Sequence, residues 1–520
     1  MKTFAAIAIG SVETEMRIYE LSPKKGMKEI DRLASRLNLG ADAYRDNKLD
    51  VDQVEELCRI LNEFRVTMLG YKVDAYQCVA TSALRELRSS MITKDHIEKQ
   101  TGLKIQIISN SEQRFMDYKS IASESESFGK IIQNGTAIVD IGGNSMQISV
   151  FDNDKLVTTA NIPMGKISTR VTYGAYAKNR FHYEQMVREL MNHEMAGFGK
   201  LYQKDRLIKN LIVMDADLLE ILRHLHASGL TGKFRESESV YHVDAATFFT
   251  VYDAVMKLTP DEISRRYQVS ADTGILVIQS MIFTRCLIEK LGIEMLWLID
   301  VSICDGMCYD YGIRAKQIKS KHNFDEDIIA ASRNIAKRYK SSSSHIHNLE
   351  ELALQIFDRM KKISGLGSRE RLLLQIAVIL HNCGKYISLN NVSDCAYNII
   401  MATEIIGLSH AERQIIANVV RFNTSEFAYY DALASISDVS RDEYLVIAKL
   451  TAILRLANSL DRSHEQKFHD ASVSLKENKL TISIATAEDI TLEKIAMAEQ
   501  AGFFEEVFNV TPVISQKKKY

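Results

Sequence analysis

The chain has few of the features that direct a protein to a membrane, an oxidising compartment or nucleic acid. Its seven cysteines are odd in number and scattered, and only Cys304 and Cys308 lie close together. This pattern does not indicate a zinc site and favours buried free thiols in a reducing cytoplasm. No stretch approaches about 18 uninterrupted apolar residues, and the N-terminus leads directly into a predicted strand. We therefore predict a cytoplasmic protein that makes no membrane contact.

A surplus of one charge is also absent. The 520 residues include 65 Lys and Arg against 67 Asp and Glu, which gives a formal net charge of −2. Such a chain has no overall basic field, so we expect no nucleic-acid partner and only a local site for any polyanion. The composition, 46% hydrophobic and 25% charged, is typical of a globular protein, and the length predicts three or four domains.

A short glycine turn between two apolar stretches is the most informative segment. A β-branched run leads to Asp140, turns at Gly142 and Gly143, and returns as an alternating strand. This pattern predicts a β-hairpin. Glycines let backbone N–H groups approach an anion closely, and Asn144 and Ser145 add side-chain donors. We expect the turn to hold phosphate, with Asp140 facing a metal ion or a water molecule beside it.

The start of the chain has a similar pattern. An apolar run over residues 4–9 ends in Gly10 and Ser11, and a second strand is predicted over residues 16–21. Either turn alone could be ordinary hairpin chemistry. Two such units at matching positions suggest a duplicated α/β domain with one phosphate-cradling hairpin in each half. This layout resembles the actin-like and sugar-kinase-like superfamily.

Changes in pattern along the chain predict its domains. Strands and helices alternate through the first part, which indicates a layered α/β fold. After a polar segment at 319–327, helical periodicity replaces the strand signals, and β patterns return near the C-terminus. The predicted domains cover residues 1–127, 128–318, 325–468 and 469–514.

Several motifs in a fixed order resemble the exopolyphosphatase and guanosine pentaphosphate phosphatase (Ppx/GppA) family over nearly the whole chain. They lie at residues 10–11, 80–86, 107–109, 139–143, 163–165, 305–307, 379–385 and 454–464. The resemblance implies an α/β fold with two ribonuclease-H-like lobes, followed by an all-helical HD-like domain and a small α/β C-terminal domain. It also implies removal of a terminal phosphate from polyphosphate or pppGpp with a divalent metal, usually Mg²⁺. We expect a homodimer.

Phosphoryl transfer needs donors for the phosphate oxygens, a cation and a carboxylate that activates water. Asp140 is the expected Mg²⁺ ligand and a candidate catalytic residue. Arg85 can contribute a bidentate guanidinium as a further catalytic group. The candidate phosphate-binding residues are Gly10, Ser11, Gly142, Gly143, Asn144 and Ser145.

The carboxylate is where the chain departs from the family pattern. The position of the catalytic glutamate falls on Gln113, and an amide cannot take up a proton. Glu112 is adjacent, but neighbours on a helix point about 100° apart, so it replaces the base only if the helix start is shifted. We therefore keep Glu112 and Gln113 as candidate catalytic positions and expect any hydrolysis to be slow.

Other departures add negative charge or remove donors. The first loop lacks its aspartate and carries Glu13, and a second metal-helping glutamate falls on Gln147. The third phosphate loop matches a segment containing Asp215 and Asp217. These changes are compatible with a working but altered site, with an inactive homologue kept for binding or assembly, or with a changed substrate. In the last case Asp215, Asp217 or Glu13 would bind a metal or a cationic group.

The helical part departs from its pattern as well. HD phosphohydrolases hold metals with a His, a His-Asp pair and a distant Asp, for which His345 or His347, His381 and Asp461 are in plausible positions. The pair here is His381-Asn382, and an amide is a poor substitute for a bridging carboxylate. We predict that His381 is structural and hydrogen-bonds Asp461, and that this domain binds or dimerises rather than catalyses.

Overall fold

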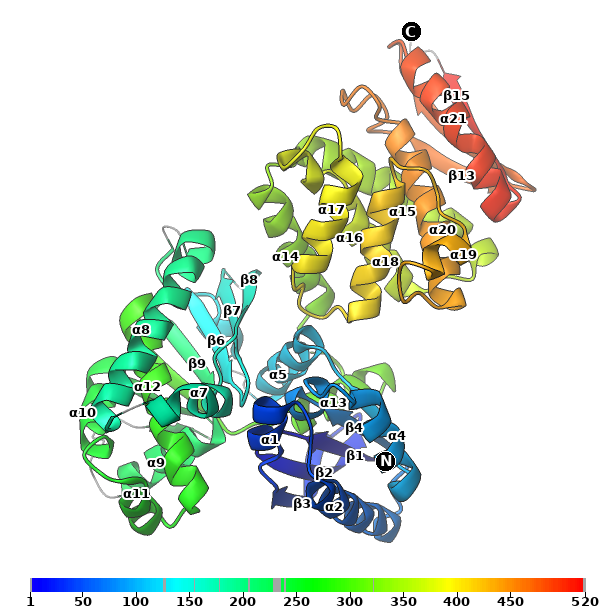
Figure 1. The fold of residues 1–520 in the computed structure, drawn as a ribbon. Helices are drawn as coiled ribbons and strands as arrows, with labels where there is room; N and C mark the ends of the chain where they lie inside the picture. The colour runs from blue at the N-terminus through cyan, green and yellow to red at the C-terminus, as the bar shows by residue number, and fades with distance from the viewer. Residues whose placement is uncertain are drawn as a thin grey trace. The chain divides into compact units, whose positions relative to one another are not determined.

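The chain divides into two compact units, Met1–Asn323 and Phe324–Tyr520, in the computed structural model. The structure describes residues 2–124, 128–153, 155–176, 178–203, 206–227, 235–237, 240–320 and 322–517. The first unit contains two β-sheets with helices, and the second is mainly helical with a small sheet at its C-terminal end (Figure 1).

The first sheet of unit 1 has five strands in the order β3-β2-β1-β4-β5. They are β1 (Lys2–Ile9), β2 (Glu13–Ser22), β3 (Gly26–Arg36), β4 (Ala75–Ala80) and β5 (Ile105–Ile107). Strands β1, β2 and β3 are antiparallel neighbours, whereas β4 and β5 run parallel to β1. The alternating β1 side chains are buried on both faces, which explains why this run reads as continuously apolar.

The second sheet has seven strands in the order β10-β11-β12-β9-β6-β7-β8. They are β6 (Thr136–Ile141), β7 (Met146–Asp152), β8 (Lys155–Ile162), β9 (Asn210–Met214), β10 (Arg235–Ser237), β11 (Val240–Asp244) and β12 (Met295–Ile299). The hairpin β6–β7 and its neighbour β8 are antiparallel, while β9 and β12 are parallel to β6. Strands β8-β7-β6-β9-β12 therefore repeat the arrangement of the first sheet.

Helices connect and cover these strands (Figure 1). In the first part they are α1 (Leu39–Asp46), α2 (Val51–Gly70), α3 (Ser82–Arg85), α4 (Ser90–Thr101), α5 (Asn110–Glu124) and α6 (Phe128–Ile131). They continue with α7 (Lys166–Tyr173), η1 (Gly174–Tyr176), α8 (Arg180–Phe198), η2 (Gly199–Gln203), α9 (Ala216–Ala227), α10 (Ala245–Val255), α11 (Pro260–Tyr267), α12 (Ala271–Leu291) and α13 (Ile303–Arg314). Helix α12 is long and apolar enough to cross a membrane, but 78% of its most apolar window is buried, as in a core helix.

Helix α13 returns to the first sheet. Its residues Cys304, Met307 and Cys308 share a buried cluster with Phe4 and other β1 residues. The segment was expected to belong with the second lobe, up to residue 318, but its apolar face covers β1. A Cβ atom at Gly306 would lie 2.0 Å from the carbonyl oxygen of Met116, so glycine is required for α13 to approach α5 this closely.

Both predicted hairpins are present. Strand β1 pairs with β2 across the Gly10 turn, and β6 pairs with β7 across the turn that begins at Gly142. The sequence did not indicate β3, β8 or β11. Strand β3 is an edge strand whose residues are mostly half-buried or exposed, so it lacks the apolar alternation that marked the central strands.

Unit 2 begins with α14, within the segment predicted as a polar linker. Its helices are α14 (Phe324–Arg338), α15 (Ser343–Ser364), α16 (Ser368–Leu380), η3 (Cys383–Tyr386), α17 (Val392–Ala402), α18 (His410–Phe422), α19 (Tyr430–Ala434) and α20 (Arg441–Ser459). The C-terminal part contains β13 (Ser472–Lys476), β14 (Lys479–Ala485), α21 (Thr491–Phe508) and β15 (Thr511–Lys517), with the strand order β13-β14-β15. The predicted helical region and the final β-hairpin are confirmed.

The cysteines are all free thiols. Six of them are buried, and Cys395 is half-buried. The prediction of buried apolar thiols is confirmed for these six, since cysteine packs as a small apolar side chain.

A buried histidine pair joins three segments of unit 2. The His345 Nδ1 atom on α15 lies 2.6 Å from Asp461 Oδ2, and its Nε2 atom lies 3.2 Å from Nε2 of His381, which follows α16. His381 donates through Nδ1 to the carbonyl of Val378 at 2.6 Å. Since Nδ1 of neutral His381 is the donor in this bond, its Nε2 carries the lone pair that faces the His345 ring, and the orientation of the His381 ring is fixed.

The expected bond from His381 to Asp461 is therefore wrong. His345 makes that bond, because the Nδ1 atom of His381 is turned toward its own helix. His347 is exposed and pairs with Glu351 at 3.4 Å. That this domain binds or dimerises rather than catalyses stays a prediction.

Burial, together with the neighbouring His345, lowers the pKa of His381 to about 3. The unfolded chain takes up this proton near pH 6.5, so the stability that neutral His381 contributes is full above that pH and is lost as the pH falls. At pH 5 the loss is about 2 kcal/mol. In NMR spectra, the His381 ring signal, identified by its loss in His381→Gln, should show no titration between pH 8 and pH 5. A midpoint near 6.5 would contradict the buried neutral state.

Candidate functional site

A polar cavity lies where the central strands of both sheets in unit 1 end. It has a volume of about 260 Å³ and is lined by residues from the two hairpin turns, from α5 and from the end of β9. Parallel strands bring their carboxyl ends to one edge of a sheet, which is where α/β proteins commonly bind ligands. Six candidate residues line it: Gly10, Ser11, Gln113, Asp140, Gly142 and Gly143.

The glycine turn of the second hairpin is held by the first turn of α7. The N–H groups of Lys166 and Ile167 donate to the carbonyls of Gly142 and Gly143 at 3.0 and 2.9 Å. A Cβ atom at Gly165 would lie 2.3 Å from the Gly143 oxygen, so only glycine allows this approach. These bonds satisfy N–H groups that a helix start leaves open, and they fix the shape of the turn.

The first turn packs directly against the second. A Cβ atom at Gly143 would lie 2.8 Å from the Cβ of Ser11. The Ser11 hydroxyl hydrogen-bonds the Tyr44 hydroxyl and lies 3.0 Å from the Ser82 hydroxyl, which is 2.7 Å from that of Tyr44. Ser11 therefore shares its hydrogen-bonding capacity with two neighbours. Within the described chain, the N–H of Gly143 has no hydrogen-bond partner.

Helix α5 brings an amide and a carboxylate to the cavity. Gln113 Nε2 donates to Asp140 Oδ2 at 3.1 Å. Asp117 follows Gln113 by four residues, on the same face of the helix, and also lines the cavity. Asp117 is only 6% exposed, and its Oδ2 atom has no hydrogen-bond partner among the described residues. The cavity thus contains a buried carboxylate that the family motif did not indicate.

Burial raises the proton affinity of both aspartates. Burial raises the pKa of Asp140 to about 6, with Asp215 adding to the rise and Lys166 opposing it. The pKa of Asp117 is also raised, chiefly by burial and further by the charge of Asp140. Carboxylates in this state gain from a nearby cation, because it offsets both the desolvation and their mutual repulsion.

A buried lysine occupies the place where the third phosphate loop was expected. Lys166 is 6% exposed, and its Nζ atom lies 3.1 Å from Asp215 Oδ1 and 2.9 Å from Asp217 Oδ2. Asp215 also accepts from Ser280, and Asp217 accepts from Arg36 at 2.9 Å. The two carboxylates raise the pKa of Lys166, and Lys166 with Arg36 lowers that of Asp217 despite its burial. Asp215 and Asp217 thus bind a cationic group that belongs to the chain itself.

Glu13 lies at the rim of the cavity. Burial raises its pKa, Glu15 adds to the rise, and Arg36 opposes it from 4.0 Å. The negative charge expected near the first loop is therefore present and only partly offset.

Other candidate residues lie outside this cavity. Glu112 accepts from the backbone N–H and the hydroxyl of Ser109, at 2.9 and 2.8 Å, so its side chain caps the start of α5. Arg85 donates to the carbonyl of Ile108 and to Asn110, at 2.7 and 2.5 Å. These bonds leave Gln113, rather than Glu112, facing the cavity.

Asn144 and Ser145 line a second cavity beside the glycine turn. It has a volume of about 470 Å³, and Glu86 and Asn110 also line it. Glu86 follows Arg85 in the sequence, and Asn110 accepts a hydrogen bond from the Arg85 side chain. The structure thus divides the predicted phosphate donors between two neighbouring cavities, with the turn Gly142–Ser145 between them.

Magnesium fits the donors present. Mg²⁺ in phosphoryl-transfer sites is commonly held by one or two carboxylates, with water and substrate phosphates as the other ligands. Asp140 and Asp117 offer such a pair, and Asp117 has an unpartnered buried oxygen. Among the residues described, no group of three or more His, Cys, Asp or Glu side chains forms a metal cage. The two carboxylates therefore suit an ion whose remaining ligands are water molecules and the oxygens of a bound phosphate.

Sequence reasoning missed Lys166 and Asp117. Lys166 directly follows the motif at residues 163–165, but nothing in the local pattern links it to Asp215, which is 49 residues further along. Asp117 could have been found, since a helix from residue 111 places it one turn after Gln113.

Two family models match the chain. The model described as Ppx/GppA phosphatase family matches residues 17–227, and that of Ppx/GppA phosphatase, domain III, matches residues 329–500. Together they cover well over half of the sequence and include residues of both units.

Individual relatives match over most of their length. A guanosine-5'-triphosphate,3'-diphosphate pyrophosphatase of Pseudoalteromonas translucida is 21% identical over 493 residues, which is 92% of this chain and 91% of the relative. The protein of the same name from Aliivibrio fischeri is 19% identical over 457 residues, 87% of this chain and 86% of the relative.

Solved structures share the mixed α/β fold. An exopolyphosphatase from Cytophaga hutchinsonii superposes with a TM-score of 0.53 at 13% identity, covering 62% of this chain and 100% of that one. The Ppx/GppA family member from Aquifex aeolicus gives a TM-score of 0.50 at 16% identity, with 62% and 99% covered. With the matched motifs, sheets and cavity in place, the chain belongs to the Ppx/GppA phosphatase family.

Proposed function

We propose that the chain is a phosphohydrolase that removes the terminal phosphate of inorganic polyphosphate or guanosine pentaphosphate, at a reduced rate. Relatives named for guanosine-5'-triphosphate,3'-diphosphate hydrolysis and a neighbour named exopolyphosphatase support this substrate class. The observation that carries the proposal is the unpartnered carboxylate oxygen of Asp117, beside Asp140 in the cavity of the two hairpin turns. A cytoplasmic location and a homodimer belong to the same proposal.

The cavity offers each part that phosphoryl transfer needs. The open N–H of Gly143 can donate to a phosphate oxygen. Asp140 and Asp117 would hold Mg²⁺, which supplies positive charge against the phosphates. Asp117 can orient a water molecule and accept its proton, a role that the amide of Gln113 cannot fill. Gln113 instead holds Asp140 through their 3.1 Å bond.

Lys166 has a positioning role in this mechanism. Its charge is shared between Asp215 and Asp217, so it does not reach a phosphate as a free cation. It lowers the proton affinity of Asp140 and keeps two further carboxylates from repelling the substrate.

An inactive binding protein is the second candidate. Two observations favour it: the Ser11 hydroxyl is engaged by Tyr44 and Ser82, and an amide stands at the base position. A phosphate-release assay with Mg²⁺ on both substrates separates the candidates. Release supports the enzyme, and its ratio between the substrates identifies the preferred one. Ligand-induced thermal stabilisation without release supports the binding protein.

Replacement of Asp117 by Asn tests the carboxylate directly. We expect phosphate release at saturating Mg²⁺ to fall about 10²-fold or more, because general-base assistance typically contributes about 10²–10⁴-fold. The thermal midpoint should stay or rise, since burial disfavours the charged form of Asp117, as its raised pKa shows, and Asn carries no charge. Asp52→Asn, at an exposed position of α2, is the matched control and should leave phosphate release unchanged. Unchanged release in Asp117→Asn would exclude this role.

Replacement of Gln113 by Glu tests why the reaction is slow. We expect faster phosphate release, by up to about 10²-fold, because a base returns to the family position. The variant should also reach its full rate at a lower Mg²⁺ concentration, since the new side chain would add a third carboxylate beside Asp117 and Asp140 and so attract the cation more strongly. The measurement is release rate against Mg²⁺ concentration. An equal or lower rate in a folded variant would show that the amide does not limit hydrolysis.

A further inference from the structure

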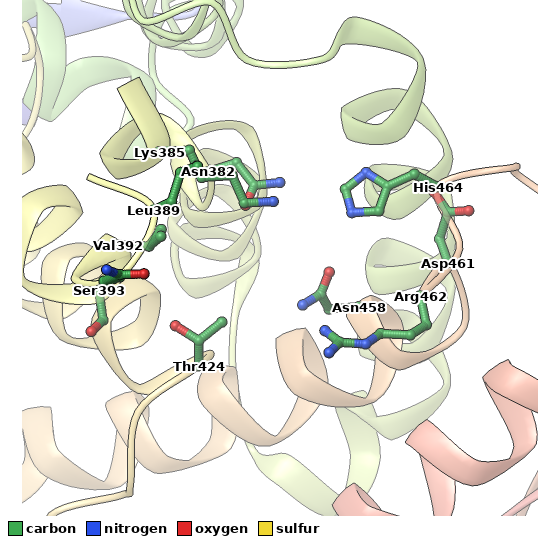
Figure 2. A pocket seen from close by; sticks show the side chains of 11 residues that line it. Asn382, Lys385, Leu389, Val392, Ser393, Thr424, Asn458, Asp461, Arg462 and His464 are labelled. Atoms are coloured by element: carbon green, nitrogen blue, oxygen red, sulfur yellow. The ribbon is translucent and has the colours of Figure 1, made fainter. Parts of the chain in front are cut away.

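A separate polar cavity lies within unit 2. It has a volume of about 310 Å³, in the range of small-molecule sites, and is enclosed by η3, the start of α17 and the end of α20 (Figure 2). These segments are far apart in the sequence, and each contributes a polar side chain. The cavity is independent of the cleft in unit 1 and of the function proposed there.

Two cationic side chains face this cavity without a counter-ion. Lys385 from η3 and Arg462, just after α20, reach into the space from opposite sides (Figure 2). Neither makes a salt bridge or a side-chain hydrogen bond within the described part of unit 2. Burial lowers the pKa of Lys385, and the charge of Arg462 lowers it further, so the two cations repel each other. An anion between them would remove this cost.

Neutral donors surround the two cations. The amides of Asn382 and Asn458 point into the same space, with Thr424 at the lower edge of the view in Figure 2. Their side chains have no hydrogen-bond partners among the residues that the structure describes. Ser393, in the first turn of α17, also lines the cavity, and the N-cap of that helix makes no side-chain capping bond. These groups complement the cations as donors to anionic oxygens.

The carboxylate that lines this cavity, Asp461, is held by hydrogen bonds of its own. Asp461 accepts from His345 through Oδ2 at 2.6 Å and from the N–H of Gln466 through Oδ1 at 2.8 Å. His464 stacks on the His345 ring at 3.8 Å, which covers the pair. Asp461 keeps its negative charge, because these bonds lower its pKa despite its burial, but both of its oxygens are engaged, whereas Lys385 and Arg462 have no such partners among the described residues.

We propose that this cavity binds the phosphate or diphosphate group of a small anion, held between Lys385 and Arg462. The guanidinium suits two phosphate oxygens at once, and the ammonium adds a compact charge. Leu389 and Val392 form an apolar wall beside these groups, so an organic phosphate fits as well as an inorganic one. The group that the cavity recognises is the phosphate, which either a nucleotide or inorganic pyrophosphate can supply.

Calorimetric titration of the full chain with pyrophosphate and, separately, with GDP tests the proposal. We expect Lys385→Gln/Arg462→Gln to weaken binding by about 10²-fold or more, because two charge-assisted hydrogen bonds to the phosphate are lost together. Lys362→Gln/Arg441→Gln removes two exposed cations from the same unit and should stay within about twofold of the unchanged chain. Without ligand, the first variant should keep its thermal midpoint, since its two cations repel each other.

Hydrogen exchange locates the bound anion and separates this cavity from the cleft in unit 1. Added ligand should protect residues 382–395 and 458–464. Binding of GDP alone identifies an organic phosphate, and equal binding of pyrophosphate identifies the phosphate group itself. If neither binds, if the Lys385/Arg462 variant binds as the unchanged chain does, or if protection is confined to residues 140–146, the proposal is wrong.

Discussion

The buried ion cluster around Lys166 is the constraint on which the cleft of unit 1 depends. Lys166 lies between Asp215 and Asp217, and Arg36 extends the cluster to β3 of the first sheet. Breaking such a pair leaves an unpaired buried charge and typically costs about 3–5 kcal/mol. The same residue begins α7, whose first N–H groups hold the Gly142 turn. One residue therefore links the shape of the turn, through its backbone N–H, to the charge of the cleft, through its side chain.

The close packing of α13 against α5 also positions side chains in the cleft of unit 1. Gly306 lets α13 approach the backbone of α5 at Met116, and Asp305 anchors α13 to the sheet through Arg17 and Tyr19 at 3.0 and 2.8 Å. Helix α5 carries Gln113 and Asp117 into the cavity. The motif at residues 305–307 thus has a structural explanation: it sets the position of the helix that presents the amide and the carboxylate.

The sequence predicted what local patterns encode. The two hairpins, β4 and the helical region of unit 2 follow from apolar alternation, glycine turns and helical periodicity. Edge strand β3 was not predicted, because its side chains are half-buried or exposed and show no clear alternation of apolar and polar residues. The charge partners could not be predicted for a different reason. Lys166 and Asp215 are far apart in the sequence, as are His345 and Asp461, and only the tertiary fold brings the members of each pair together. The sequence analysis therefore overestimated the negative charge that Asp215 and Asp217 add to the cleft, because Lys166 and Arg36 pair with them.

The two cavities differ in how they use positive charge. In unit 1, Lys166 and Arg36 are committed to Asp215 and Asp217, and the buried Arg114 offsets the charge of Asp117 and Asp140 only in part, since the pKa of both stays raised; a cation from outside would therefore be favoured there. In unit 2 the carboxylate is committed to His345, which leaves Lys385 and Arg462 in need of an anion. A phosphate therefore enters the first cavity most favourably together with a divalent ion, whereas the second can take it alone. Because these cations are partly exposed, salt screens the second interaction more strongly than it screens the buried pairs around Lys166.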